Sequence, residues 1–232
     1  MLNEIFINQQ LDSLGLTNFL RYAIHWLVSQ GFSLELLILV LLLPLSATLM
    51  AFVRYFVGLQ GLGIFAPLMM GVIFLSTGLV PGVILFLFIL LIEVLFIYAL
   101  RSLKIHFLAK MALILLIVCL GFFLILLLVP KFNLQPLFNF SLIPILVLII
   151  LGENLAEIQV RTSFKSGLGA VIETLILATL AFFVLSAILL RKMMLLYPEA
   201  MILMIVVLDL AIGHFSGLRL LEYRRFKHLL KK

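Results

Sequence analysis

The chain of 232 residues is 66% hydrophobic and 11% charged, with a mean hydropathy of +1.37. This composition excludes a soluble globular domain, because water does not tolerate so much apolar surface, and it excludes a disordered chain, because disorder needs low hydrophobicity. The net charge of +6 does not indicate nucleic-acid binding, since the basic residues lie mostly between and after apolar runs, where lipid headgroups account for them. We therefore predict an all-α, polytopic membrane protein with the lipid bilayer as its main partner.

The first 33 residues are predicted to form an extracytoplasmic segment with an amphipathic helix over residues 17–30. Its polar residues Asn18, Arg21 and His25 recur at helical spacing, with apolar residues opposite and Gly31 as the expected terminator. Such a helix typically lies in the membrane–water interface, although a partner-binding helix is an alternative. The segment lacks the basic start and small-residue cleavage site of a secretory signal peptide, so none is predicted.

Seven apolar stretches are predicted to cross the membrane as helices, because about 20 apolar residues span the roughly 30 Å of hydrocarbon. Ser33 is a suitable N-cap for the first helix, and Pro44 predicts a kink within it. Residues 55–92 carry no charge, and one helix of that length would extend roughly 57 Å, so the glycine- and proline-rich turn at 77–82 must divide them. The predicted spans cover residues 36–53, 62–79, 81–100, 109–129, 141–164, 167–190 and 198–213.

The second predicted span is the least regular, since it contains Gly61, Gly63 and Pro67. A broken helix at membrane depth is tolerated only against protein or a water-filled cavity. Close packing between helices is the commoner role of small residues such as these glycines.

The basic residues predict the orientation in a bacterial inner membrane. Of the sixteen lysines and arginines, four fall on the side of the N-terminus and twelve on the opposite side. Basic loops are typically cytoplasmic, so we expect a periplasmic N-terminus and a cytoplasmic C-terminus. The predicted organisation is an extracytoplasmic segment at 1–33, a seven-span membrane domain at 34–213 and a basic cytoplasmic tail at 214–232.

Four carboxylates inside predicted spans are the candidate proton or cation site, namely Glu93, Asp209, Glu173 and Glu153. Each lies eight to ten residues from a basic residue on the cytoplasmic side, which places them at a similar depth, roughly 12 to 15 Å inward. If the helices bring them together, like charges in a low dielectric do not all ionise, so at least one carboxyl binds a proton. This arrangement would suit proton or cation handling.

A structural role is the alternative for the same residues. Glu157 and Arg161 are four residues apart and are candidates for a pair along one helix face. We prefer structural pairing for Glu153, Glu157 and Glu173. The two interpretations stay open for Glu93 and Asp209, which have no basic residue within one turn on their own helices.

Enzymatic signatures are absent from the sequence. It contains no HExxH, CxxC, GxxxxGK[ST] or GxSxG motif, so we predict no catalytic residue, no metal site and no cofactor. The single cysteine, Cys119, lies in an apolar run and forms no intramolecular disulfide.

Five short motifs occur along the chain: GLGIFAP at 61–67, TGL at 77–79, GE at 152–153, YPE at 197–199 and GHFSGLRLLE at 213–222. Together they resemble the bacterial seven-transmembrane module that is usually fused to an inactive transglutaminase-like domain. The resemblance covers about residues 54–226, and its most specific part is the C-terminal motif. Two differences are Ala66, where a threonine is expected, and the short segment before the first span, in which we expect no transglutaminase-like domain.

This resemblance implies a non-enzymatic inner-membrane subunit that anchors or exports the product of a cytoplasmic ATP-grasp peptide ligase of the RimK-like kind. It also implies a periplasmic transglutaminase-like protein as a partner, and it transfers no catalytic residues. The turn at 77–82 is similar to the small CapC-like membrane subunit of poly-γ-glutamate synthesis. A proton- or cation-coupled small-molecule transporter that uses the intramembrane carboxylates is the alternative.

Overall fold

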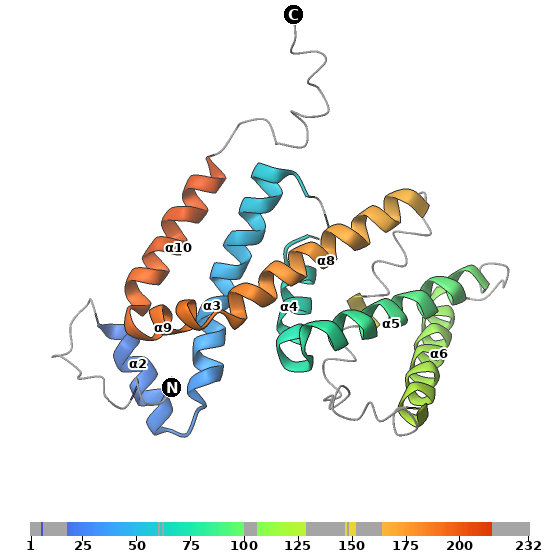
Figure 1. The fold of residues 1–232 in the computed structure, drawn as a ribbon, viewed down its shortest axis with the longest axis horizontal. Coiled ribbons are helices and arrows are strands. Elements are labelled where there is room, and N and C mark those ends of the chain that lie inside the picture. The colour runs from blue at the N-terminus through green and yellow to red at the C-terminus, as the bar shows by residue number, and fades with distance from the viewer. Residues whose placement is uncertain are drawn as a thin grey trace, which may run out of the picture. The chain divides into compact units, whose positions relative to one another are not determined.

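Every regular element in the described part of the chain is a helix (Figure 1). The structure is a computed structural model that describes residues 6, 18–59, 61, 63–99, 106–128, 147, 149–151 and 164–214. Among these residues are three helices long and apolar enough to cross a membrane, or four if one bent pair counts as a single span. This confirms an all-α membrane protein. The count of seven spans stays a prediction, since most of the predicted span at 141–164 lies outside the described residues.

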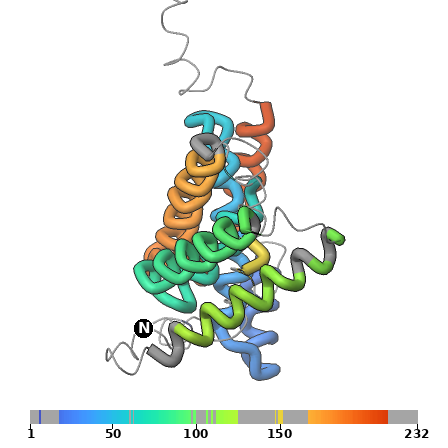
Figure 2. The backbone as a smooth tube through the Cα atoms, turned by 90° about the vertical axis from the view of Figure 1, so that its right-hand side faces the viewer, coloured from blue at the N-terminus to red at the C-terminus, as the bar shows by residue number. Residues whose placement is uncertain are grey.

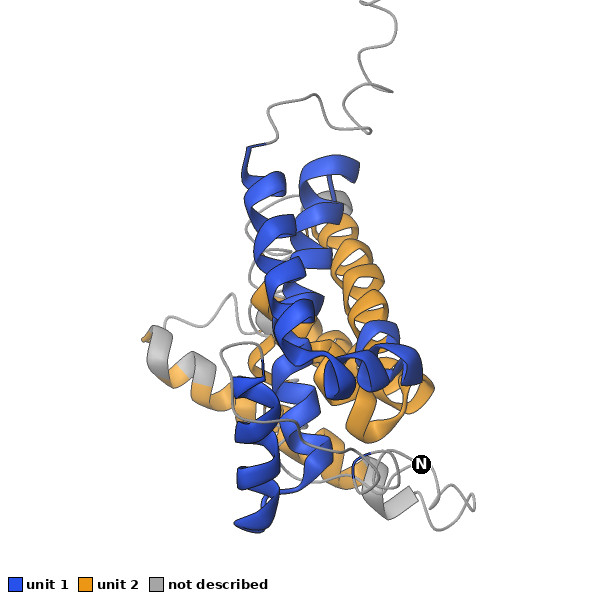
Figure 3. Ribbon diagram, turned by 90° about the vertical axis from the view of Figure 1, so that its left-hand side faces the viewer, with its two compact units in different colours: residues 1–59, 183–232 blue, residues 60–182 orange. Residues whose placement is uncertain are grey.

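The chain divides into two compact units, which are described separately below (Figure 3). Unit 1 contains residues 1–59 and 183–232, and unit 2 contains residues 60–182. The predicted organisation into segments 1–33, 34–213 and 214–232 stays a prediction. Apart from His214, the predicted basic tail lies outside the described residues.

Unit 1 is built around its longest helix, α3. The helices α9 and α10 pack against α3, and α2 packs against both α3 and α10. Leu42 and Met50 of α3 are almost completely buried, because these apolar side chains face the neighbouring helices. The elements of unit 1 are α2 (Phe19–Ser29), α3 (Leu34–Phe52), the π-helical turn η1 (Val53–Val57), α9 (Ile188–Leu196) and α10 (Pro198–Gly213).

Local signals in the sequence correctly predicted how α2 ends and α3 begins. Gly31 has a φ of +95°, a left-handed conformation that ends α2 without steric cost. The Ser33 hydroxyl then accepts a hydrogen bond from the Leu36 amide at 3.4 Å and caps α3. α3 continues through Pro44, and the irregular turn comes later, as η1. The interfacial position of α2 stays a prediction.

Unit 2 contains the helices α4, α5 and α6 and most of α8 (Figure 2). α5 packs against both α4 and α6, and the core includes Phe74, Phe86 and Val118, none of which is exposed. Gly78, with a φ of +89°, forms the turn predicted at 77–82. α4 is only 13 residues long and so is shorter than the predicted span at 62–79. The elements are α4 (Phe65–Thr77), α5 (Leu79–Ala99), α6 (Phe107–Leu128) and α8 (Phe164–Ser186), whose last residues belong to unit 1.

The predicted helix at 167–190 was wrong at its C-terminal end. The helix ends at Ser186, Ala187 is extended with φ −64° and ψ 111°, and the short helix α9 begins at Ile188. No glycine or proline marks this break, so the continuous apolar run concealed it. Arg191 Nε donates a hydrogen bond to the Leu185 carbonyl at 2.6 Å, which satisfies a carbonyl at the end of α8. α9 is bent by 110° relative to α10.

Candidate functional site

Glu93 is the most deeply buried of the predicted site residues. It lies in α5 with an exposed fraction of 0%, and no other ionisable side chain whose burial the structure describes is fully buried. Its helix also contributes Phe86 and Ile89 to the core of unit 2. A carboxylate inside a membrane helix costs about 2.5 to 3.5 kcal/mol on insertion scales. The structural and the functional interpretation of Glu93 both stay open.

Glu173 binds the irregular segment before α4. Its Oε2 accepts a hydrogen bond from the backbone amide of Gly61 at 2.9 Å, across 112 residues of sequence. Gly61 has a φ of +28°, and an added Cβ would lie 3.2 Å from Leu177 Cδ1 and 3.4 Å from Thr174 Oγ1. The Glu173 carboxylate therefore connects α8 to Gly61, at the position where the sequence predicted an irregular second span.

The other two residues of the predicted irregular region, Gly63 and Pro67, lie close to the start of α4. Gly63 has a φ of +60°, a conformation that suits glycine, and an added Cβ there would meet no atom within 4 Å. Pro67 lies buried in the first turn of α4, where a missing amide proton costs no helical hydrogen bond. These two residues therefore shape the backbone, while Gly61 also makes the contact with Glu173.

Asp209 lies in α10 of unit 1, in a different environment from that of Glu93. Its side chain is exposed, and so are the neighbouring Leu208 and Leu210. Glu153, Glu157 and Arg161 lie outside the described residues. The shared layer of four acids thus stays a prediction. In the described part of the chain, no group of three or more His, Cys, Asp or Glu side chains could hold a metal ion.

A polar cluster in unit 1 joins α2 to the junction of α9 and α10. Glu199 Oε1 accepts a hydrogen bond from the Arg21 backbone amide at 3.0 Å, although the two residues are 178 positions apart. Glu199 belongs to the first turn of α10, and its carboxylate lies at the N-terminal end of α2. Both helix N-termini favour negative charge. The Arg21 guanidinium donates to the Leu196 carbonyl at the end of α9 and lies 6.0 Å from the centre of the Tyr197 ring.

Sequence reasoning missed this cluster. It placed Arg21 on the polar face of an amphipathic helix and Glu199 at the start of another helix, and both placements were correct. Nothing in either local pattern indicated that the two would meet. The usable signal was the YPE motif at 197–199, which combines an aromatic residue, a helix start and a carboxylate.

His25 lies one turn after Arg21 on the same helix. Its ring stacks on Phe6, with ring centres 4.1 Å apart. Burial lowers the pKa of His25 below the usual 6.5, and the nearby positive charge of Arg21 lowers the pKa further. The lowered pKa favours the neutral form of the ring.

Apolar helices with exposed leucine, isoleucine, valine and phenylalanine side chains define the class of this protein as an all-α, multi-pass membrane protein. Residues 3–230 match a family model described as seven transmembrane helices usually fused to an inactive transglutaminase. The chain therefore belongs to this family of seven-transmembrane modules, as its motifs predicted. Neither a curated protein nor a solved structure matches the chain significantly, and the similarity to CapC-like subunits is not confirmed.

Proposed function

We propose that this chain is a non-enzymatic inner-membrane subunit that anchors or exports the product of a cytoplasmic ATP-grasp peptide ligase. The observation that carries the proposal is that two of the described carboxylates act as structural contacts. Glu173 binds a loop amide and Glu199 binds the start of α2. Membership of a family whose modules are usually fused to an inactive transglutaminase supports a module that works together with other domains or proteins.

Co-purification in the native host tests this proposal. A mild-detergent pull-down of the tagged chain is expected to recover a soluble ATP-grasp ligase and a periplasmic transglutaminase-like protein. The matched control is another tagged inner-membrane protein of similar span count, expressed at the same level. Recovery of neither partner, under conditions that preserve the helical fold, would contradict the proposal.

The proposed orientation has its own test. We expect the N-terminus in the periplasm and the C-terminus in the cytoplasm, as the twelve basic residues on one side favour. Reporter fusions at Met1 and Lys232 should give signals in opposite compartments. Signals in the same compartment would exclude an odd number of spans.

A proton- or cation-coupled transporter is the second candidate, and the complete burial of Glu93 favours it. Buried carboxylates in membrane helices commonly bind protons or ions along a transport pathway. The test compares proton and substrate flux in liposomes for the wild type, Glu93→Gln and Asp209→Asn. A loss of flux in Glu93→Gln supports this function, and equal flux in all three proteins removes both carboxylates from any transport mechanism.

A further inference from the structure

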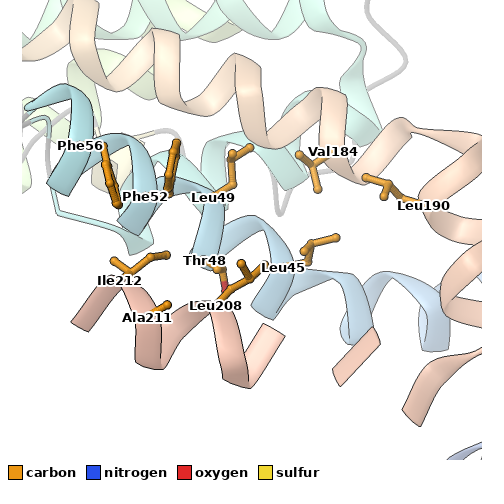
Figure 4. A pocket seen from close by; sticks show the side chains of 10 residues that line it. All are labelled: Leu45, Thr48, Leu49, Phe52, Phe56, Val184, Leu190, Leu208, Ala211 and Ile212. Atoms are coloured by element: carbon orange, nitrogen blue, oxygen red, sulfur yellow. The ribbon is translucent and has the colours of Figure 1, made fainter. Parts of the chain in front are cut away.

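Unit 1 contains a cavity of about 410 Å³ between α3, η1 and the C-terminal part of α10 (Figure 4). The side chains that form it come from five elements of unit 1, including the last turns of α8 and the short helix α9. Phe52 and Leu208 line it and expose 43% and 42% of their surface, so the cavity opens to the surroundings. Its lining residues are Leu45, Thr48, Leu49, Phe52, Phe56, Val184, Leu190, Leu208, Ala211 and Ile212.

The lining is almost entirely hydrocarbon. Thr48 contributes the one polar side chain, and its hydroxyl donates a hydrogen bond to the Pro44 carbonyl at 3.0 Å. The remaining nine side chains have no polar atoms. A polar ligand entering this cavity would lose its hydrogen bonds to water without new partners, so the cavity selects an apolar occupant.

Two stacked aromatic rings line part of the cavity. Phe52 at the end of α3 and Phe56 in η1 have their ring centres 4.5 Å apart. Each ring therefore supports the other along the wall of the cavity. On the opposite side, α10 carries the small Ala211 between the larger Leu208 and Ile212. Figure 4 shows these side chains around the same space.

The size of the cavity indicates that a hydrocarbon chain would fit and that a helix of another protein would not. With roughly 30 Å³ for each small group, 410 Å³ accommodates on the order of a dozen methylenes. A transmembrane helix is about 10 Å in diameter with its side chains and would not enter. In a multi-pass membrane protein, the hydrocarbon available to an open cavity is a lipid chain.

Charge at one end of the cavity indicates which lipid headgroup is favoured. Arg54 lies in η1, at the depth of the cavity residues Phe52 and Phe56 but on another face of the helix. An arginine at the end of a membrane helix attracts anionic lipid. We propose that unit 1 binds one acyl chain of an anionic phospholipid in this cavity, with the headgroup at the depth of Arg54. This site is independent of the proposed ligase partner.

Photolabelling in lipid nanodiscs tests the site. The full chain is reconstituted with a trace of phosphatidylglycerol that carries a diazirine in one acyl chain, and adducts are mapped by mass spectrometry after illumination. Adducts are expected to concentrate at cavity residues of α3 and α10. Equal labelling of these residues and of Leu203, which lies on α10 outside the lining and is 69% exposed, would overturn the proposal.

Two substitutions of the same kind refine the test. Ala211→Phe fills the cavity and should reduce cavity labelling about fivefold, whereas Leu203→Phe adds an aromatic ring to the exposed face and should leave it unchanged. Undiminished labelling in a folded Ala211→Phe protein would overturn the site. If this variant does not fold, the distribution of adducts in the wild-type protein still tests whether lipid binds in the cavity.

The headgroup preference is measured in the same system. The corresponding phosphatidylcholine probe should label the wild-type cavity at least threefold less, and Arg54→Gln should remove that difference. Equal labelling of wild type by both probes would overturn the anionic preference. In native membranes, a photoreactive amino acid at Phe56 should yield a lipid adduct, and a protein adduct instead would overturn the lipid as occupant.

Discussion

The two units are stabilised in different ways. In unit 2, helices approach so closely that glycine is required: a Cβ on Gly71 would lie 2.4 Å from Ala181 Cβ, and one on Gly82 would lie 2.6 Å from Phe74 Cδ1. In unit 1, an added Cβ on Gly31 or Gly213 would meet no atom within 4 Å. Unit 1 instead joins its helix ends through polar contacts and leaves an apolar cavity.

This difference separates a rigid part from an adaptable one. Close backbone approach in membranes gains van der Waals contact that lipid cannot replace, so unit 2 depends on shape. Unit 1 depends on a few hydrogen bonds at exposed or half-buried positions, where each is worth less, and its cavity has room for an occupant. Binding functions are therefore expected in unit 1 and resistance to opening in unit 2.

The largest expected effect is that of Gly71→Ala in unit 2. The new methyl group would collide with Ala181 Cβ and lie 3.1 Å from both the Ala178 carbonyl oxygen and the Phe182 amide nitrogen. Because backbone atoms form this contact, the substitution should lower the free energy of unfolding by about 1 to 3 kcal/mol. Unfolding in mixed detergent, followed by circular dichroism, measures it.

Gly169→Ala is the matched control for that change. Gly169 also lies in a helix of unit 2, but an added Cβ would meet nothing within 4 Å. The alanine should leave stability unchanged or raise it by about 0.5 to 1 kcal/mol, through the smaller entropy of the unfolded chain. Equal effects of the two substitutions would contradict shape-dependent packing in unit 2.

A smaller effect is expected for Arg21→Ala in unit 1. This change removes the hydrogen bond to the Leu196 carbonyl and the contact with the Tyr197 ring, while the backbone amide still binds Glu199. We expect a loss of about 1 kcal/mol, because a charged donor at a half-buried site contributes modestly. Proteolysis near α2 should become faster. Lys192→Ala in α9 removes a cation elsewhere in the unit and should not change that rate.

The smallest effect is the pH dependence that His25 contributes. Its pKa is lowered in the folded protein from 6.5, so below about pH 6.5 the unfolded chain binds the proton more strongly than the folded chain. Stability should therefore be constant above that pH and fall as the pH is lowered further. Unfolding midpoints measured between pH 7.5 and 5 should show this decline, and His25→Gln should reduce it. A midpoint that rises on acidification would contradict the burial of a neutral ring.

The sequence alone predicted much of the fold through local signals. Hydropathy predicted the helices, Gly31 and Ser33 predicted the boundary between α2 and α3, and Pro198 predicted the start of α10. These signals suffice because a backbone in lipid must satisfy its own hydrogen bonds within each helix. The break at Ala187 was not predictable in this way, because no local residue there disfavours a helix.

The sequence by itself determined the class of protein, the family and most helix boundaries, since each depends on residues close together along the chain. Only the tertiary structure decided which carboxylates act as contacts. Glu173 meets Gly61 across 112 residues and Glu199 meets Arg21 across 178, and the cavity combines side chains from five elements. Such sites arise when helices pack side by side, and hydropathy along one helix does not specify which residues of another helix it will face.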